Sequence, residues 1–275
     1  MFMKQLKFLM VAFTLLMGVS FTSCLNDDAG ESMYDGIGYV RTVMGSYFVD
    51  LYGNTYHPTM ASVTEMEAQG FKMSGTDLAQ IAFKYVEDTP ATKAEGGTFT
   101  PQDYRIKLVS AIAVDSYSTR YASSVEDMEA IPETAPIVTL EPTDNYGQTY
   151  KPWMYGAEML VLPISWKIVY MENKEEMLKQ HTMELVYIND ESNESSTELV
   201  FYLRHNKGTD TKTDVFAVRN KAYDVKQIMS DFKGKHGSYP TTIRIKAKTD
   251  MDGAKLPEKY TDYTIENFKW NPSNQ

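Results

Sequence analysis

The chain has one cysteine, Cys24, among its 275 residues. A single thiol leaves no partner for an intrachain disulfide and too little for a thiolate metal site, so packing alone must stabilise the fold. The four histidines are scattered, and no two of them have the spacing that places metal ligands on one face of a helix or strand. The sequence therefore signals no metal site, and we expect no cofactor.

Catalytic signatures are also missing. No nucleophile elbow, phosphate-binding loop, dinucleotide fingerprint or zinc-protease motif occurs. Asp250-Met251-Asp252-Gly253 resembles half of a calcium loop without its closing glutamate, and Asp-Gly predicts a β-turn there. We expect no enzyme and assign no catalytic residues. A hydrolase acting on envelope polymers stays open as an alternative, and it would need two carboxylates about 5 to 9 Å apart in a cleft.

Positive charge is scarce. The formal net charge is −10, with 37 acidic against 27 basic residues. Phosphate-backbone ligands require concentrated lysine and arginine, so nucleic acid is excluded as an expected partner. Long apolar runs are scarce too: 8–19 is short of the roughly 20 residues that cross a bilayer, and no later run approaches that length.

What is present at the start of the chain is a targeting segment. Lys4 and Lys7 precede the apolar run 8–19, and small residues follow it. This order is typical of a secretory signal peptide, which is removed and belongs to no fold. We expect cleavage after residue 23, so that 1–23 is a signal peptide and 252 residues (275 minus 23) remain.

The segment Phe21-Thr22-Ser23-Cys24 resembles the lipobox of bacterial lipoproteins, with Phe21 in place of the usual leucine. The resemblance implies that Cys24 is the lipidation site and carries palmitate-type acyl chains. Two or more chains hold a protein firmly on a membrane, so this lipid would suffice as the anchor. The alternative is an ordinary secreted protein with a stray cysteine.

An acidic tether follows the cysteine at 24–35. Asp27 and Asp28 resemble the export signal that sends Bacteroidota lipoproteins to the outer cell surface, and the composition of the segment is that of an unfolded spacer. We expect an outer-membrane lipoprotein that faces the cell exterior, with a periplasm-facing position as the alternative.

The next segment, 36–117, predicts a small β-barrel. Met44-Gly45-Ser46 and Gly53-Asn54 are hairpin turns between alternating runs, and 89–103 is a long excursion rich in glycine and proline. The five predicted strands are 38–43, 47–52, 55–57, 78–87 and 105–114. Five short strands in about 80 residues can close into a barrel.

This part of the chain contains three short motifs: Tyr34-Asp35-Gly36, Gly38-Tyr39-Val40 and Tyr47-Phe48-Val49-Asp50 before Gly53-Asn54. They resemble the N-terminal part of NigD-like lipoproteins of Bacteroidota. The resemblance implies an OB-type barrel followed by a β-sandwich, and the name of the family implies bacteriocin immunity. It carries no functional residues over to this chain.

Residues 118–135 break the strand rhythm and predict a linker, with a helical turn at 125–130. Beyond it, 136–275 predicts a β-sandwich, with a helix at 225–232 and Asp224 as its cap. The seven strand candidates are 137–140, 158–170, 181–188, 199–204, 215–222, 241–248 and 260–270. The fold class is therefore all-β.

Three aromatic residues form the most apolar cluster outside the predicted strands: Tyr150, Trp153 and Tyr155. If exposed, they are the leading binding patch; otherwise they plug the interface between the domains. Tyr47, Phe48, Tyr52 and Tyr56 offer stacking faces for sugars, but half of a strand's aromatics face the core, and packing is the preferred role. Polar loops at 189–197 and 205–214 are further candidate contacts.

These observations favour a non-catalytic, lipid-anchored envelope protein that binds a partner protein or glycan at the cell surface. The main alternative is a bacteriocin immunity or stress-protective lipoprotein, as the family resemblance implies. No motif identifies a specific ligand.

Overall fold

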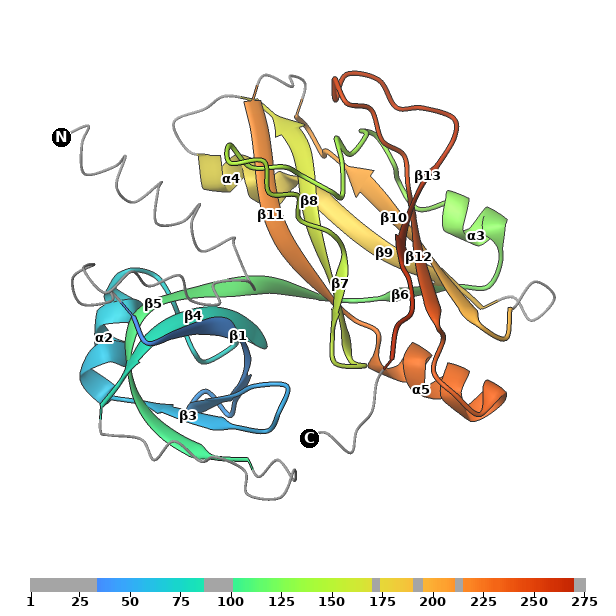
Figure 1. The fold of residues 1–275 in the computed structure, drawn as a ribbon. Coiled ribbons are helices and arrows are strands. Elements are labelled where there is room, and N and C mark those ends of the chain that lie inside the picture. The colour runs from blue at the N-terminus through green and yellow to red at the C-terminus, as the bar shows by residue number, and fades with distance from the viewer. Residues whose placement is uncertain (1–33, 87–100, 170–173, 190–194, 211–214, 270–275) are drawn as a thin grey trace. The chain divides into compact units, whose positions relative to one another are not determined.

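The computed structural model describes residues 34–86, 101–169, 174–189, 195–210 and 215–269. The chain divides into two compact units, one ending at Asp115 and the other running from Ser116 to Asn271. The signal peptide, most of the tether and Cys24 lie outside the described residues. Each unit is built from strands, as Figure 1 shows, which confirms the predicted all-β class.

The first unit is a closed five-stranded barrel. Its strands are β1 (Gly36–Val43), β2 (Tyr47–Val49), β3 (Thr55–Pro58), β4 (Leu78–Tyr85) and β5 (Asp103–Ser118), of which the last runs on into the second unit. They pair in the order β3-β2-β1-β4-β5, and a parallel pairing of β3 with β5 closes the ring. Closure removes the free sheet edges, and this order is that of the predicted OB-type barrel.

Side chains that alternate between the two faces of each strand fill the interior of the barrel. Phe48, Tyr56 and Ile106 point inward and are buried, and α2 (Met60–Ala68) contributes Met66 to the same core. Burial of Phe48 and Tyr56 confirms the packing role preferred for them, whereas Tyr52 is 58% exposed. The helix α2 was not predicted from the sequence; it begins where the Thr59 side chain accepts the N–H of Ser62.

Two turns set the register of the first hairpins. Met44 and Gly45 both have positive φ, at 50° and 64°, and the N–H of Ser46 donates to the carbonyl of Val43. Positive φ at both central residues is typical of a primed β-turn, and three residues connect the paired Val43 and Tyr47. In the next turn the Asp50 carboxylate accepts the N–H groups of Tyr52 and Asn54.

The second unit contains two sheets. One consists of β7 (Trp153–Tyr155), β8 (Met159–Ile168) and β11 (Val215–Asp224), paired antiparallel. The other runs β13-β12-β10-β9-β6. Its strands are β6 (Arg120–Ala122), β9 (Thr182–Ile188), β10 (Glu198–Asn206), β12 (Thr242–Ala247) and β13 (Thr261–Ile265).

A continuous apolar core holds the second unit together. Leu162 and Trp166 of β8, Phe201 of β10 and Ile245 of β12 are all buried in it. The helix α5 (Lys226–His236) adds Ile228, Met229 and Phe232 to this core. The predicted helix at 225–232 is therefore present but longer; Val225 occupies its cap position, while the Asp224 carboxylate accepts the N–H of Lys226.

Some predicted elements differ in the structure. Residues 137–140 form only isolated bridges, through Ile137 and Thr139, and the strand predicted at 260–270 ends at Ile265. The predicted linker at 118–135 contains β6 and α3 (Val125–Glu129) and belongs to the second unit. The sequence reading also missed α4 (Lys174–Gln180).

The stretch at Asp250 forms the predicted turn. The Asp250 carboxylate accepts the N–H groups of Asp252, Ala254 and Lys255, so its oxygens bind backbone. Among the described helices, none is long and apolar enough to span a membrane.

Candidate functional site

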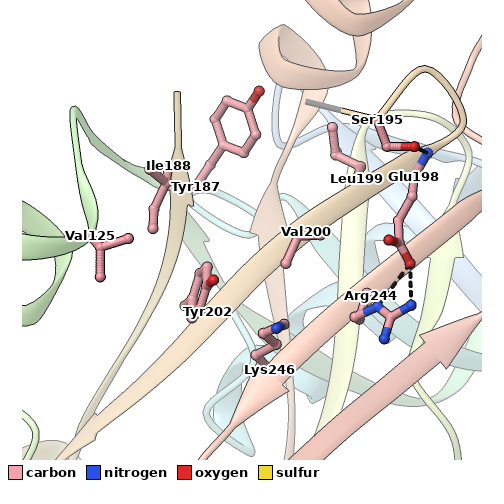
Figure 2. A pocket seen from close by; sticks show the side chains of 10 residues that line it. All are labelled: Val125, Tyr187, Ile188, Ser195, Glu198, Leu199, Val200, Tyr202, Arg244 and Lys246. Carbon is pink, nitrogen blue, oxygen red and sulfur yellow. Dashed lines mark hydrogen bonds and ion pairs between the residues drawn. The ribbon is translucent and has the colours of Figure 1, made fainter. Parts of the chain in front are cut away.

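A pocket of about 480 Å³ lies on the outer face of the five-stranded sheet of the second unit, the face that points away from the core (Figure 2). Its size is within the range usual for small-ligand sites. The lining residues come from β9, β10, β12, the start of α3 and the segment before β10: Val125, Tyr187, Ile188, Ser195, Glu198, Leu199, Val200, Tyr202, Arg244 and Lys246.

Strand alternation directs these side chains. Along β10, Leu199, Phe201 and Leu203 are buried in the core, so the residues between them face outward. The outward residues of β10 include Val200 and Tyr202, which form the floor of the pocket in Figure 2. The same period-two rule along β12 places Arg244 and Lys246 outward beside them, because β12 pairs with β10 in parallel.

One end of this face is covered. The helix α3 begins where the Ser124 hydroxyl accepts the N–H of Asp127, and it presses Met128 onto the sheet. Met128 is 1% exposed and packs with Ala122, Ile131 and Val186. The cover stops at Val125, whose side chain forms a wall of the pocket and is 47% exposed.

Arg244 is clamped at the rim. Its guanidinium donates to Glu198 Oε1 through Nε at 2.8 Å and to Asp262 Oδ2 through Nη1 at 2.7 Å. Dashed lines in Figure 2 mark the contacts with Glu198. Hydrogen bonds to Asp262 and Glu198 raise the pKa of Arg244 above its ordinary value. Two carboxylates therefore balance this cation, and the guanidinium is fixed in one orientation.

Lys246 has a different environment. Its Nζ lies 5.9 Å from the centre of the Tyr202 ring, and within the described part of the chain no carboxylate is within ion-pair distance of it. A lysine beside an aromatic face, without an acidic partner, is available to a ligand anion. The pocket thus offers an apolar floor, tyrosine rings and one available positive charge.

The acidic and hydroxyl groups at the rim of the pocket are engaged in hydrogen bonds. Glu198 is held by Arg244, and the Ser195 oxygen accepts the N–H groups of Thr197 and Glu198. No histidine or cysteine is among the described residues that line the pocket. Among the residues whose positions are described, no pair of carboxylates faces the pocket without a cationic partner.

A second polar cluster lies inside the unit. His181 Nδ1 is 2.8 Å from His205 Nε2, and His181 Nε2 is 2.9 Å from Asp210 Oδ2. His205 Nδ1 in turn is 2.9 Å from the carbonyl of Pro136. We call His181, His205 and Asp210 the histidine chain; their exposure is 3% or less.

Ring-to-ring contact leaves no room for an ion between the two histidines. In the described ranges no group of three or more histidine, cysteine or acidic residues has a geometry that holds a metal. Burial lowers the pKa of His205 to about 4, so this ring is neutral near pH 7. The prediction of a hydrophilic loop at 205–214 is therefore wrong in part, because His205 belongs to β10 and Asp210 is buried.

The residues predicted as a binding patch lie elsewhere. Trp153 and Tyr155 form β7, with ring centres 6.1 Å apart, so they are not outside the strands as expected. Tyr155 is 3% exposed, Trp153 is half-buried, and the Tyr150 hydroxyl donates to Asp144. None of the three lines the pocket. The alternation of apolar and polar residues along β10 and β12 identifies the residues that face outward into the pocket, and this pattern can be read from the sequence.

No family model and no curated protein matches the chain. Solved structures do match its fold. A candidate lipoprotein of Bacteroides fragilis is 21% identical, with a TM-score of 0.64 over 86% of this chain and 98% of its own. A Bacteroides vulgatus protein of unknown function is 10% identical, with a TM-score of 0.50 over 84% and 89%.

A NigD-like immunity protein of Bacteroides caccae also matches, at 11% identity and a TM-score of 0.46 over 82% of this chain and 90% of its own. A NigD-like protein is thus among the matches, as the resemblance drawn from the sequence predicts. At these identities the likeness is one of fold.

Proposed function

We propose that this chain is a non-catalytic, lipid-anchored protein of the cell envelope that uses the pocket on its five-stranded sheet to bind a ligand. In this proposal the lipid on Cys24 anchors the protein in the outer membrane, and the protein faces the cell exterior. The acidic tether separates the folded units from the membrane. The observation that carries the binding role is the composition of the pocket: uncovered apolar floor, tyrosine rings and an available lysine on rigid strands.

The occupant that this lining fits best is a glycan with an acidic sugar. Tyr202 offers a ring face to a sugar, while Lys246 beside it offers a charge to a carboxylate. The fixed Arg244–Glu198 pair and Ser195 supply polar groups for hydroxyls at the rim. A partner protein with an acidic side chain would use the same two residues, so it is the second outcome that an experiment must separate.

Glycan-array binding tests the proposal. The full-length chain with Cys24→Ala should bind acidic oligosaccharides. Lys246→Gln should weaken binding about tenfold or more, since a hydrogen bond to a charged group contributes roughly 1.5–3 kcal/mol. Tyr202→Ala should also weaken binding, because it removes the ring against which the sugar packs. Lys259→Gln is the matched control, because Lys259 is exposed and lies outside the pocket.

Loss of binding in all three variants, or equal binding of neutral and acidic glycans, would contradict the role given to Lys246. If no glycan on the array binds, and an envelope protein is captured only when Tyr202 is intact, the ligand is a protein and not a glycan.

The anchor has its own test. Cys24→Ala should abolish palmitate labelling and lipoprotein-type cleavage in cells. Palmitate labelling that persists in this variant would refute lipidation at Cys24 and leave the binding pocket unaffected.

A further inference from the structure

The histidine chain is a row of three short contacts between four groups. At one end the Pro136 carbonyl is 2.9 Å from His205, in the middle the two rings are 2.8 Å apart, and at the other end His181 is 2.9 Å from Asp210. Each of these distances is that of a hydrogen bond, so each requires one hydrogen between the two heavy atoms.

Counting hydrogens shows that two neutral rings cannot make all three bonds. A neutral imidazole carries one N–H, and two rings carry two. The Pro136 oxygen can only accept, so His205 must donate from Nδ1 and accept at Nε2. His181 must then donate from Nδ1, and its Nε2 is left facing Asp210. A third hydrogen has to lie between His181 and Asp210.

The surroundings of Asp210 indicate where this hydrogen resides. The N–H of Val169 donates to the same Oδ2 atom at 3.0 Å, which suits an ionised carboxylate oxygen that accepts two donors. Imidazole also holds a proton more tightly than a carboxylate, with ordinary pKa values near 6.5 and 3.9. Both arguments assign the hydrogen to His181 as an imidazolium.

Other charges act on the chain. Lys207, on the β10–β11 connection, and Lys221, on β11, oppose a positive charge on His181. The Lys221 ammonium donates to the Tyr117 hydroxyl and lies over the Tyr117 and Trp166 rings. Trp166 packs against His181 and carries no charge.

Burial is the largest influence and lowers the pKa of His181 below its ordinary value, although the hydrogen bond and charge contact with Asp210 act to raise it. The full burial cost applies to an isolated imidazolium. An imidazolium that touches a carboxylate with 1% side-chain exposure forms a pair of no net charge, and the attraction within the pair offsets much of that cost. The hydrogen count then decides in favour of the charged ring.

We propose that the second unit contains a buried proton-binding site, in which His181 is held as an imidazolium between the Asp210 carboxylate and the neutral ring of His205. Its proton completes a chain of three hydrogen bonds that ties the residue between α4 and β9, the strand β10 and the segment 207–210 to Pro136. This goes beyond the binding role of the pocket and does not depend on it.

Release of this proton has a defined mechanical consequence. Without it, one of the three contacts sets two lone pairs against each other and must open. The connection that carries Asp210 is docked closely: a Cβ at Gly208 would lie 2.9 Å from the Gln180 carbonyl, and the Thr209 hydroxyl donates to the Gln180 side chain. Opening the chain therefore loosens this connection from the residue that precedes His181.

Nitrogen-15 spectra of the imidazole rings test the proposal without changing the site. The full-length chain with His57→Asn and His236→Asn retains only His181 and His205, and neither replaced residue belongs to the histidine chain. At pH 7 we expect one ring with two protonated nitrogens and one neutral ring protonated at Nδ1. Two neutral rings would overturn the proposal.

The pH dependence of unfolding gives an independent measurement on the same variant. Above about pH 6.5 the unfolded chain has released the His181 proton, whereas the folded chain retains it. The folded state then binds one more proton, and the unfolding equilibrium constant should rise by up to tenfold per pH unit from about pH 6.5 until the site releases its proton. A constant that falls over this range, or does not change, would overturn the proposal.

Discussion

The outer face of the five-stranded sheet in the second unit is covered by α3 at one end and open at the other. At the covered end, α3 lies over the sheet, and the charged groups beneath it are paired: Arg204, which is 5% exposed, contacts Glu133 and donates to the Ile131 carbonyl. At the open end, apolar residues are left uncovered, and Lys246 has no acidic partner among the described residues.

The covered end contributes to the stability of the fold, whereas the open end is available for binding. Buried charges without partners cost several kcal/mol, so the covered end must satisfy each of them. Residues of the open end pay no such penalty, because water reaches them, and they remain available to a ligand. Substitutions at the covered end should therefore change stability, and substitutions at the open end should mainly change ligand binding.

The largest loss of stability should follow Arg204→Met. The variant removes the guanidinium contact to Glu133, whose side chain is 3% exposed, although Lys248 still approaches that carboxylate at 3.1 Å. We expect the free energy of unfolding in urea to fall by about 3–5 kcal/mol. Arg244→Met is the matched control at the open end. Equal losses in the two variants would contradict the distinction between the ends.

Met128→Ala should come next, because it removes the apolar plug between α3 and the sheet. Met128 packs with Ala122, Ile131 and Val186, and truncation leaves a cavity that we expect to cost about 2–5 kcal/mol in thermal or urea unfolding. Val125→Ala, at the exposed edge of the same helix, should cost far less. A small effect of Met128→Ala would show that α3 is not a structural cover.

Ser124→Ala should weaken the start of α3 by about 1 kcal/mol, since the Ser124 hydroxyl accepts the N–H of Asp127. Ser196→Ala is the control, because Ser196 is exposed and caps no helix. Unfolding curves measured side by side give the comparison. An unchanged free energy of unfolding in Ser124→Ala would mean that packing of Met128 alone fixes the helix.

Arg244→Met itself should cost only about 0.2–1 kcal/mol, because its two ion pairs are partly exposed. The loss should shrink in 1 M salt, where the Debye length falls to roughly 3 Å and attraction between exposed charges is strongly screened. A loss that persists unchanged at high salt would show that packing of the arginine stem, and not charge, holds the rim.

The smallest effect concerns the pH dependence of α3. Hydrogen bonds from the Ser123 backbone and hydroxyl lower the pKa of Asp127 below its ordinary value. The stabilisation from these bonds is thus complete above the unfolded pKa near 3.9 and is lost as pH falls through the folded value. Carbonyl-carbon NMR should place the Asp127 midpoint below 3.9; a midpoint at or above 3.9 would exclude the contact.

Much of the fold follows from alternation in the sequence. The barrel strands and the central sandwich strands were predicted because apolar residues recur at every second position, as in Leu199, Phe201 and Leu203. The helix α2 was missed because its two buried residues, Ser62 and Met66, give almost no apolar stripe.

The sites were less predictable for a different reason. Alternation tells that Tyr202 and Lys246 face outward, but which part of that face stays open depends on where α3 packs. His181, His205 and Asp210 meet only because β9 and β10 pair antiparallel and the following connection folds back. No local spacing encodes a contact that topology creates, whereas Trp153 and Tyr155 form a conspicuous sequence cluster that the pocket does not use.

The most direct test of the central claim is hydrogen exchange with and without an acidic glycan that binds on the array. If the open end binds the ligand, backbone exchange should slow in β10 and β12 around Tyr202 and Lys246, while exchange in α3 and in the buried surroundings of Arg204 should not change. Protection that appears only outside the open end, for example at β7 around Trp153, would contradict this prediction.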